Sequence, residues 1–217
     1  VYAETIADLQ EQSEEHQKKL EEINQQIEAA EANKADALEQ KNLLDQQADM
    51  LHELFPDAKN VGILYCSAEA NSSYQSNTIQ KYLKDYGYEC TEYTFADSND
   101  IASVVNNAVA ASDVLYIPTD NTAASNTEII QNICQPAGIP IITGEEGICS
   151  GCGVATLSIS YYDLGYKTGE MAYEILVNGA DVSQTAVEFA PNVTKKYNVA
   201  NCEALGITVP DDYVAIE

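Results

Sequence analysis

The sequence predicts an α/β fold, a doubly wound parallel sheet, preceded by a long coiled-coil helix. Two observations support this prediction. Residues 1–55 contain neither glycine nor proline and carry an apolar stripe with heptad spacing. Beyond Pro56, short apolar runs alternate with helical patterns, as in repeated βα units. We therefore predict a coiled-coil helix over residues 1–55 and an α/β domain over residues 56–217.

The N-terminal stripe runs from Ile6 to Leu51 in steps of three and four residues. Ten of its fourteen positions are apolar, so the heptad register holds despite Lys34 and Lys41 within the stripe. A lone helix of this kind buries too little surface to be stable. We expect it to pair, either by self-association or with another coiled-coil partner, as a spacer or dimerisation helix. Residues 46–54 could belong to either part of the chain.

The start of the chain suggests export. Val1-Tyr2-Ala3 has the small-residue pattern left at the end of a signal peptide, which predicts an extracellular or cell-surface protein. The following residues 4–10, with their Glu/Gln/Lys-rich heptads, resemble the N-terminal coiled coils of secreted Gram-positive peptidoglycan-hydrolase proteins. No apolar run approaches the length of about 18 residues that a membrane span needs.

Beyond Pro56, the apolar pattern predicts each element in turn. Asn60–Cys66 and residues 113–117 are continuous apolar runs, as expected for strands covered on both faces. Further strands are predicted at 88–95, 139–142, 154–158, 186–189 and 196–199, and helices at 74–86, 101–110, 128–134 and 162–177. Such alternation favours a parallel sheet with right-handed crossovers.

The charge excludes one class of partner. The chain carries 35 acidic and 10 basic residues, a net charge of −25, and every basic residue is lysine. Both predicted parts are acidic, so phosphate backbones would be repelled, and without arginine no bidentate phosphate or guanine contact is possible. We expect no nucleic-acid binding and no adhesion to anionic membranes through a basic patch.

Six cysteines do not suggest a disulfide scaffold, because an α/β domain of this size builds its own core. Cys149 and Cys152 have CxxC spacing between two strand-like segments. They could be structural thiols or a local disulfide, a regulatory disulfide, or metal ligands. The only histidines, His16 and His52, lie on the predicted long helix, so a zinc site lacks ligands and no cofactor is expected. No Ser-His-Asp arrangement, P-loop or dinucleotide-binding motif is present, so we do not expect an enzyme.

Polar loops follow three of the predicted strands. They span residues 67–73, 118–122 and 143–147 and are rich in Ser, Asn, Asp and Glu. In open α/β sheets, ligands bind beyond the carboxyl ends of the strands. Side chains of these types could hold the ammonium and carboxylate groups of a zwitterion.

Five segments, 53–65, 67–72, 118–121, 153–166 and 204–210, occur in the order of a known family. Residues 46–217 resemble the ABC transporter substrate-binding lipoproteins of type I periplasmic-binding-protein fold, in the branch for tryptophan and other aromatic amino acids. The resemblance implies a receptor that closes two lobes around a small-molecule ligand and docks on an ABC permease. It places ligand contacts at Ser67, Asn71, Ser72, Asp120, Asn121 and Glu145. Tyr161 could supply an aromatic wall or pack within a helix.

The chain departs from this family in its first part. Most of the first lobe has no counterpart, and the predicted coiled coil stands in its position, so the fold expected is a partial one. A shuffled gene, a chimera or a truncation would each explain this. The segment 143–179 then loses its usual neighbours, which leaves apolar positions around Tyr162, Tyr166 and Met171 exposed. The alternative function is a structural or interaction protein of the cell surface that binds no ligand.

Overall fold

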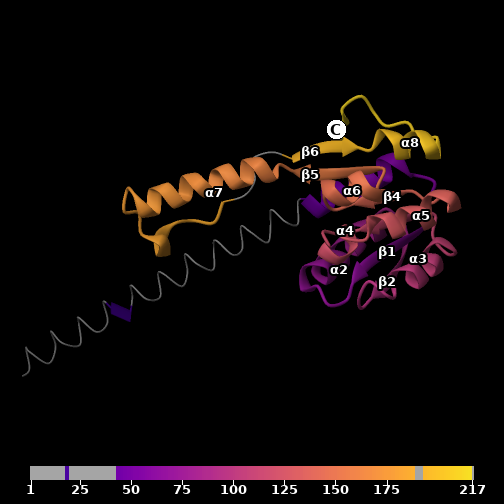
Figure 1. Cartoon of the computed structure of the whole chain (residues 1–217), viewed down its shortest axis with the longest axis horizontal. Coiled ribbons are helices and arrows are strands. Elements are labelled where there is room, and N and C mark those ends of the chain that lie inside the picture. Colours follow the sequence, from indigo (N-terminus) through magenta and orange to yellow (C-terminus); the bar gives the residue numbers. More distant parts are fainter. Residues whose placement is uncertain (1–17, 20–42, 189–192, 217) are drawn as a thin grey trace, which may run out of the picture.

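The computed structural model describes residues 18–19, 43–188 and 193–216. The strands among them form one seven-stranded sheet in the order β2-β1-β3-β4-β5-β6-β7 (Figure 1). The strands are β1 (Asn60–Cys66), β2 (Glu89–Phe95), β3 (Val114–Ile117), β4 (Ile141–Thr143), β5 (Ala155–Ile159), β6 (Val193–Tyr197) and β7 (Val214–Ala215). The first five are mutually parallel, which confirms the predicted α/β class.

Helices other than α7 cover both faces of this sheet (Figure 1). The helices of the chain are α2 (Ala70–Asp85), α3 (Ile101–Val109), α4 (Asn121–Ala124), α5 (Thr127–Ala137), α6 (Glu146–Cys152), α7 (Tyr161–Leu176) and α8 (Val199–Leu205), with a short 3-10 helix η1 (Val182–Gln184). Strand β3 shows the two-sided burial, because Val114 and Tyr116 enter one core while Leu115 and Ile117 enter the other. This explains why the strand is a continuous apolar run.

The sequence did not predict that strand β6 runs antiparallel to the strand before it. Strand β6 pairs antiparallel with β5, from Ile159 against Val193 to Ala155 against Tyr197. The chain leaves β5 at its carboxyl end, forms α7, and re-enters the sheet at that same end. Strand β6 must therefore run antiparallel to β5.

Several local predictions were wrong. Residues 186–188 of the expected strand at 186–189 form no strand, and residue 189 lies outside the described residues. Strand β5 lies between β4 and β6 in the sheet, so the segment before β6 has no open side of β5 with which to pair. Helices α4, α6 and α8 and strand β7 were missed. The helices are short, with seven residues or fewer, and so carry little periodicity.

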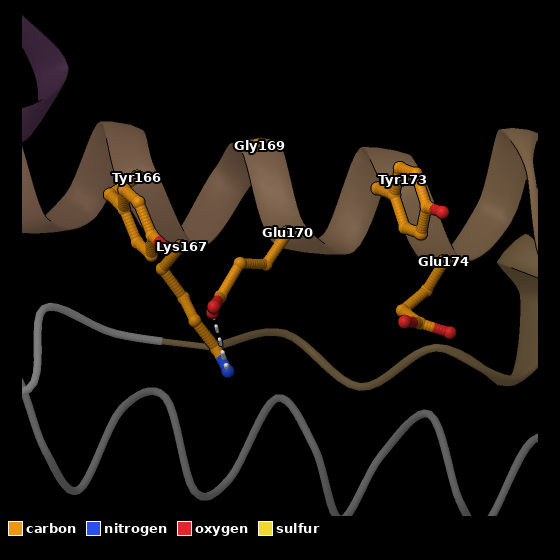
Figure 2. Close-up of a pocket in the computed structure, with 6 residues that line it drawn as sticks. All are labelled: Tyr166, Lys167, Gly169, Glu170, Tyr173 and Glu174. Carbon is orange, nitrogen blue, oxygen red and sulfur yellow. Dashed lines mark ion pairs between the residues drawn. The ribbon is translucent and has the colours of Figure 1, made fainter.

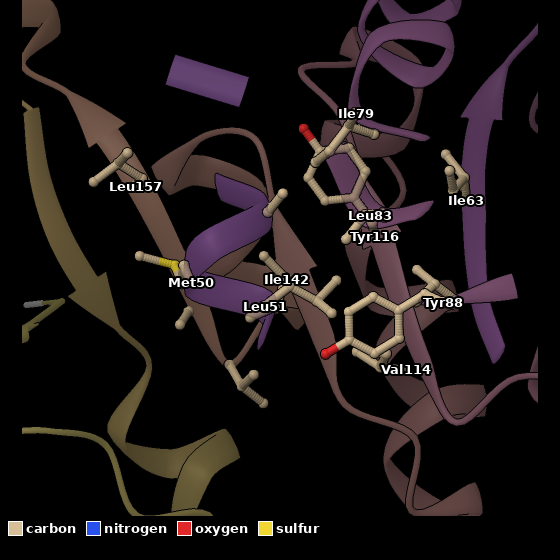
Figure 3. Packing of buried hydrophobic residues seen from close by; sticks show 14 of the residues in the cluster. Met50, Leu51, Ile63, Ile79, Leu83, Tyr88, Val114, Tyr116, Ile142 and Leu157 are labelled. Carbon is tan, nitrogen blue, oxygen red and sulfur yellow. The ribbon is translucent and has the colours of Figure 1, made fainter. Parts of the chain in front are cut away.

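The helix over residues 43–54 packs into the same core as the sheet. Met50 and Leu51 are fully buried against side chains of β3, β4 and α2 (Figure 3). The buried Gln47 donates from Nε2 to the carbonyls of Gly144 and Leu157, both at 3.4 Å, and accepts from the Tyr116 hydroxyl at 2.6 Å. These residues therefore belong structurally with the sheet.

The rest of the predicted coiled coil, apart from the helical Lys18 and Lys19, lies outside the described residues and stays a prediction. Helix α7 contrasts with the other helices. It extends away from the sheet (Figure 1), and none of its residues is buried. No helix in the described part of the chain has both the length and the apolar character of a membrane span.

Candidate functional site

The carboxyl ends of β1, β3 and β4 meet at one edge of the sheet. Strand β3 lies between β1 and β4 and is parallel to both. The loops over residues 67–73, 118–122 and 143–147 therefore come together, as the order of a parallel sheet requires. We call the edge made by these three loops the strand-end edge.

The first two loops are joined through the peptide of Thr119. Its carbonyl accepts from Asn71 Nδ2 and from Ser72 Oγ, both at 2.9 Å. Its N–H donates to Gln75 Oε1, also at 2.9 Å. Ser72 is fully buried, whereas Asn71 is exposed. Ser72 therefore holds the loops together, and Asn71 combines this contact with access to solvent.

Asp120 joins the same loops from inside. It is 1% exposed, and its carboxylate accepts from the Cys66 N–H at 2.7 Å and from the Ala123 N–H at 2.8 Å. The second contact caps the N-terminus of α4. Both oxygens are thus engaged by main-chain donors, one at the end of β1 and one in α4. Asp120 acts here as an internal strut between the two loops.

Glu69, which was not singled out from the sequence, is the third link. Its Oε2 accepts from the N–H of Asn121 at 2.9 Å and from Asn121 Nδ2 at 3.0 Å. Its Oε1 accepts from the N–H of Thr122 at 2.9 Å and from Thr122 Oγ1 at 2.8 Å. Burial alone would raise the pKa of Glu69, but these hydrogen bonds outweigh it and lower the pKa. The residue is therefore held as a carboxylate, and it fixes the exposed Asn121 side chain.

The third loop touches the second backbone to backbone at Gly144. Its N–H donates to the Ile117 carbonyl at 2.7 Å, and a Cβ at this position would lie 2.6 Å from the Thr119 nitrogen. Only glycine allows this approach. The next residue, Glu145, caps α6 by accepting from the N–H groups of Gly147 and Ile148.

Two further residues complete the rim. Ser67 is exposed, and its N–H donates to the Phe95 carbonyl at 2.9 Å. Tyr161 opens α7 and is also exposed, so it does not pack within a helix interface of the described part of the chain. Burial raises the pKa of Tyr161, and the charge of Glu145 raises it further. Tyr161 therefore lies within electrostatic reach of the third loop.

The six residues expected as ligand contacts thus gather along one edge, but with different availability. Ser67, Asn71 and Asn121 are exposed, Glu145 is half-buried, and Ser72 and Asp120 are buried. The surroundings are acidic, and Lys196 is held by Glu146 at 2.7 Å. Such an edge suits a small ligand with an ammonium group better than an anion.

The CxxC cysteines lie between β4 and β5, as expected, but on helix α6, which was not predicted. All six cysteines are free thiols. Burial raises the pKa of Cys149 to about 12 and also raises the pKa of Cys152. Redox cysteines need a lowered pKa, so the structural-thiol interpretation fits best. No group of three or more potential metal ligands occurs among the described residues.

Comparison with known proteins identifies a family. The model for "ABC transporter substrate binding protein" matches residues 22–216. A tyrosine-binding protein of Clostridioides difficile (strain R20291) is 36% identical over 133 residues, which are 61% of this chain and 39% of that relative. The chain thus spans well under half the length of this curated relative.

Solved structures agree with this match. The ligand-free, open structure of a substrate binding protein with adhesive properties from Clostridium difficile is 34% identical with a TM-score of 0.65. That match covers 80% of this chain and 60% of the other. A Streptococcus pneumoniae ABC domain in complex with L-Trp is 28% identical with a TM-score of 0.73, over 81% of this chain and 62% of the other.

The family match covers most of the chain, and the structural match to the L-Trp complex covers 81% of it. This family binds substrates and does not transform them, in line with the prediction that the protein is not an enzyme. The chain belongs to the ABC transporter substrate binding protein family, with the type I periplasmic-binding-protein fold.

Proposed function

We propose that this chain carries the solute-binding lobe of an ABC importer, with an amino acid or a similar small polar molecule as its ligand. The ligand would sit on the strand-end edge. The observation that carries the proposal is the rigidity of this edge: Asp120, Glu69 and Gly144 lock its three loops together, while Ser67, Asn71 and Asn121 remain exposed. A site fixed in advance loses less entropy on binding.

The chemistry of the edge supports an amino acid. The carboxylates of Glu69, Glu145 and Glu146 create a negative potential that favours the ligand's ammonium group, and the Asn and Ser side chains can donate to its carboxylate. The exposed ring of Tyr161, at the start of α7, offers an aromatic surface. The relatives that bind tyrosine and L-Trp make an aromatic side chain the first candidate.

The partners and location follow from the family. A receptor of this kind delivers its ligand to an ABC permease from the extracellular side, so we expect an extracellular or cell-surface protein. One exposed edge encloses a ligand on one side only, and small-molecule sites bury most of their ligand. A second lobe or another covering element is therefore part of the proposed receptor.

Thermal unfolding with L-tyrosine, L-tryptophan and L-phenylalanine tests this function. A ligand at about 100 times its dissociation constant should add about 2.7 kcal/mol, a rise in Tm of several degrees. Tyr161→Ala should abolish the shift without changing the melting of the free protein. Asn71→Ala should also abolish it, with a small drop in the Tm of the free protein, because Ser72 still bonds the Thr119 carbonyl. Asn106→Ala removes a matched exposed amide on α3 and should leave the shift intact. An unchanged Tm with every ligand would overturn the proposal.

A second candidate is a structural or interaction protein that binds no solute. The observation that favours it is the engagement of Asp120 and Glu145, whose carboxylates are both used by main-chain donors. Under this alternative, the strand-end edge only stabilises the domain. A cooperative melt that no amino acid shifts would support it.

A further inference from the structure

The support of the strand-end edge lies in the core of the domain. The pocket on α7 is lined by residues of that helix between Tyr166 and Glu174 (Figure 2), so none of its lining residues belongs to the three strand-end loops. The helix over residues 43–54, in contrast, packs into the same core as Tyr116 of β3 (Figure 3). From this helix, the side chain of Gln47 reaches both Tyr116 and the third loop.

Gln47 occupies a core position of this helix. It is 1% exposed, and the residues that share its side of the helix, Leu43, Met50 and Leu54, are apolar and pack into the core of the sheet. Burying an amide costs free energy unless the amide is hydrogen-bonded, whereas an apolar side chain here would carry no such cost. The partners of Gln47 therefore indicate what the amide does.

Tyr116 fixes the orientation of this amide. Its hydroxyl donates to Gln47 Oε1 at 2.6 Å, and burial raises the pKa of Tyr116, so the hydroxyl keeps its proton. The two hydrogens on Gln47 Nε2 are then directed to the carbonyls of Gly144 and Leu157, both at 3.4 Å. A rotated amide would set its own oxygen against these two carbonyl oxygens, which would repel it.

The two carbonyls belong to different elements. Gly144 lies in the third loop and Leu157 in β5, so one side chain joins the helix, the loop and the strand. Gly144 is held from both sides, because its N–H donates to the Ile117 carbonyl at 2.7 Å and its carbonyl accepts from Gln47. Hydrogen bonds as long as 3.4 Å are individually weak. Their expected effect is therefore on the position of the loop more than on the stability of the domain.

Gly144 passes its position on to two of the candidate ligand contacts. Glu145 follows it directly in the chain, and a Cβ on Gly144 would lie 2.6 Å from the Thr119 nitrogen, so the second and third loops are in tight backbone contact. The Thr119 carbonyl in turn accepts from Asn71 Nδ2 at 2.9 Å. A displacement of Gly144 would therefore shift Glu145 and disturb the residue to which Asn71 is bonded.

We propose that Gln47 is a positioning residue of the solute site. It holds the third loop against the second from inside the core and does not itself touch the ligand. This role rests on the proposed function, because it makes Gln47 a determinant of the affinity for an amino acid at the same edge. Methionine is close to glutamine in length and adapts to core positions. Gln47→Met should therefore leave the domain folded and release the loop.

Isothermal titration calorimetry with L-tyrosine and L-tryptophan measures the affinity. Gln47→Met should raise the Kd of whichever amino acid binds the wild type about tenfold, the factor that one or two hydrogen bonds are worth. Leu51→Ala, one turn further along the same helix, lowers stability by leaving a cavity and should not change the Kd. A Gln47→Met protein with the Kd of the wild type, or an equal loss of affinity in Leu51→Ala, would overturn the proposal.

Tyr116→Phe removes only the hydroxyl that orients the amide. It should raise the Kd by a smaller factor than Gln47→Met, and the double variant should bind no more weakly than Gln47→Met alone, because Tyr116 acts through Gln47. This variant also decides the matter if Gln47→Met does not fold. Fully additive losses of affinity would contradict an action of Tyr116 through Gln47.

Hydrogen exchange of the free protein measures the loop without a ligand. Gln47→Met should speed the exchange of the Gly144 N–H about tenfold, and by more than that of the amides of α3, whereas Leu51→Ala should not single out the loop. If the wild type binds neither amino acid, the proposed function is wrong, and the exchange of Gly144 alone decides whether Gln47 positions the loop. Exchange of Gly144 at the wild-type rate in Gln47→Met would overturn the positioning role whatever the titrations give.

Discussion

The strand-end edge and helix α7 differ in how many of their side chains have partners within the described part of the chain. At the edge, both carboxylate oxygens of Asp120 and of Glu69 accept hydrogen bonds from donors of this chain. In α7, four tyrosines and Leu176 are exposed. The polar groups of the first region are satisfied within the chain, whereas the second region exposes large apolar side chains.

This difference separates stability from recognition. Residues that are internally satisfied contribute to the free energy of unfolding, so their substitution should lower it. The exposed residues of α7 contribute little to that free energy, so their substitution should hardly change it. Three predictions, each with a matched control, test this separation.

The largest effect is expected when a buried leucine of the core, rather than an exposed leucine of α7, is shortened to alanine. Leu51→Ala should lower the free energy of unfolding by about 3 kcal/mol, because it leaves a cavity in the core. Leu176→Ala removes the same group from an exposed position and should change it by less than about 0.5 kcal/mol. Urea unfolding at low protein concentration measures both. Equal effects would contradict the separation and would place residues 43–54 outside the core.

A smaller effect is expected at the strut. Asp120→Ala should cost about 2 kcal/mol, since it leaves the buried N–H groups of Cys66 and Ala123 without an acceptor. The exposed Asp211 provides the control, and its replacement by alanine should be nearly neutral in the same urea titration. A neutral Asp120→Ala would show that water replaces the strut and that the loops are not locked by it.

The smallest effect is a change in pH dependence at Glu69. Its pKa in the folded protein lies below the ordinary value of 4.5, so its stabilising contribution is complete above that value. The contribution is lost as the pH falls through the lowered folded pKa. Glu69→Gln should therefore be less stable than the wild type at pH 7, and this difference should shrink below about pH 4.5.

The midpoints of urea unfolding at pH 7 and at a pH below about 4.5 measure this difference in stability. Glu203→Gln, at an exposed site on α8, should follow the wild type throughout. If Glu69→Gln lowers the free energy of unfolding by the same amount at both pH values, the negative charge of Glu69 is not what holds the loops together.

The sequence allowed the strongly apolar strands to be predicted, but not the short elements. Asn60–Cys66 is buried along nearly its whole length, and such a continuous apolar run has few alternatives to a strand covered on both faces. Helices α4 and α6 begin directly after Asp120 and Glu145, whose side chains cap them. A capping contact depends on a backbone turn that the tertiary structure supplies, so the sequence indicated neither residue as a helix cap.

The candidate site was predictable in place but not in detail. The rule that ligands bind at strand ends located all three loops, because it requires only the order of a parallel sheet. It could not assign Asp120 to a buried strut, or Glu69 to the loop of Asn121, since those contacts join residues more than fifty positions apart. Gly144 gave no signal either, because its role depends on how closely the loop at Thr119 passes.

The pairing of Ile159 with Val193 makes the segment between them a separable module. These residues are direct antiparallel partners, so their ends already stand where a tight hairpin would begin. A two-residue Asn-Gly turn has the geometry to join them. Replacing residues 160–192 in this way would leave the seven strands in their present order. The receptor lobe and the helix that reaches beyond it could then be studied, and exchanged, as two independent parts.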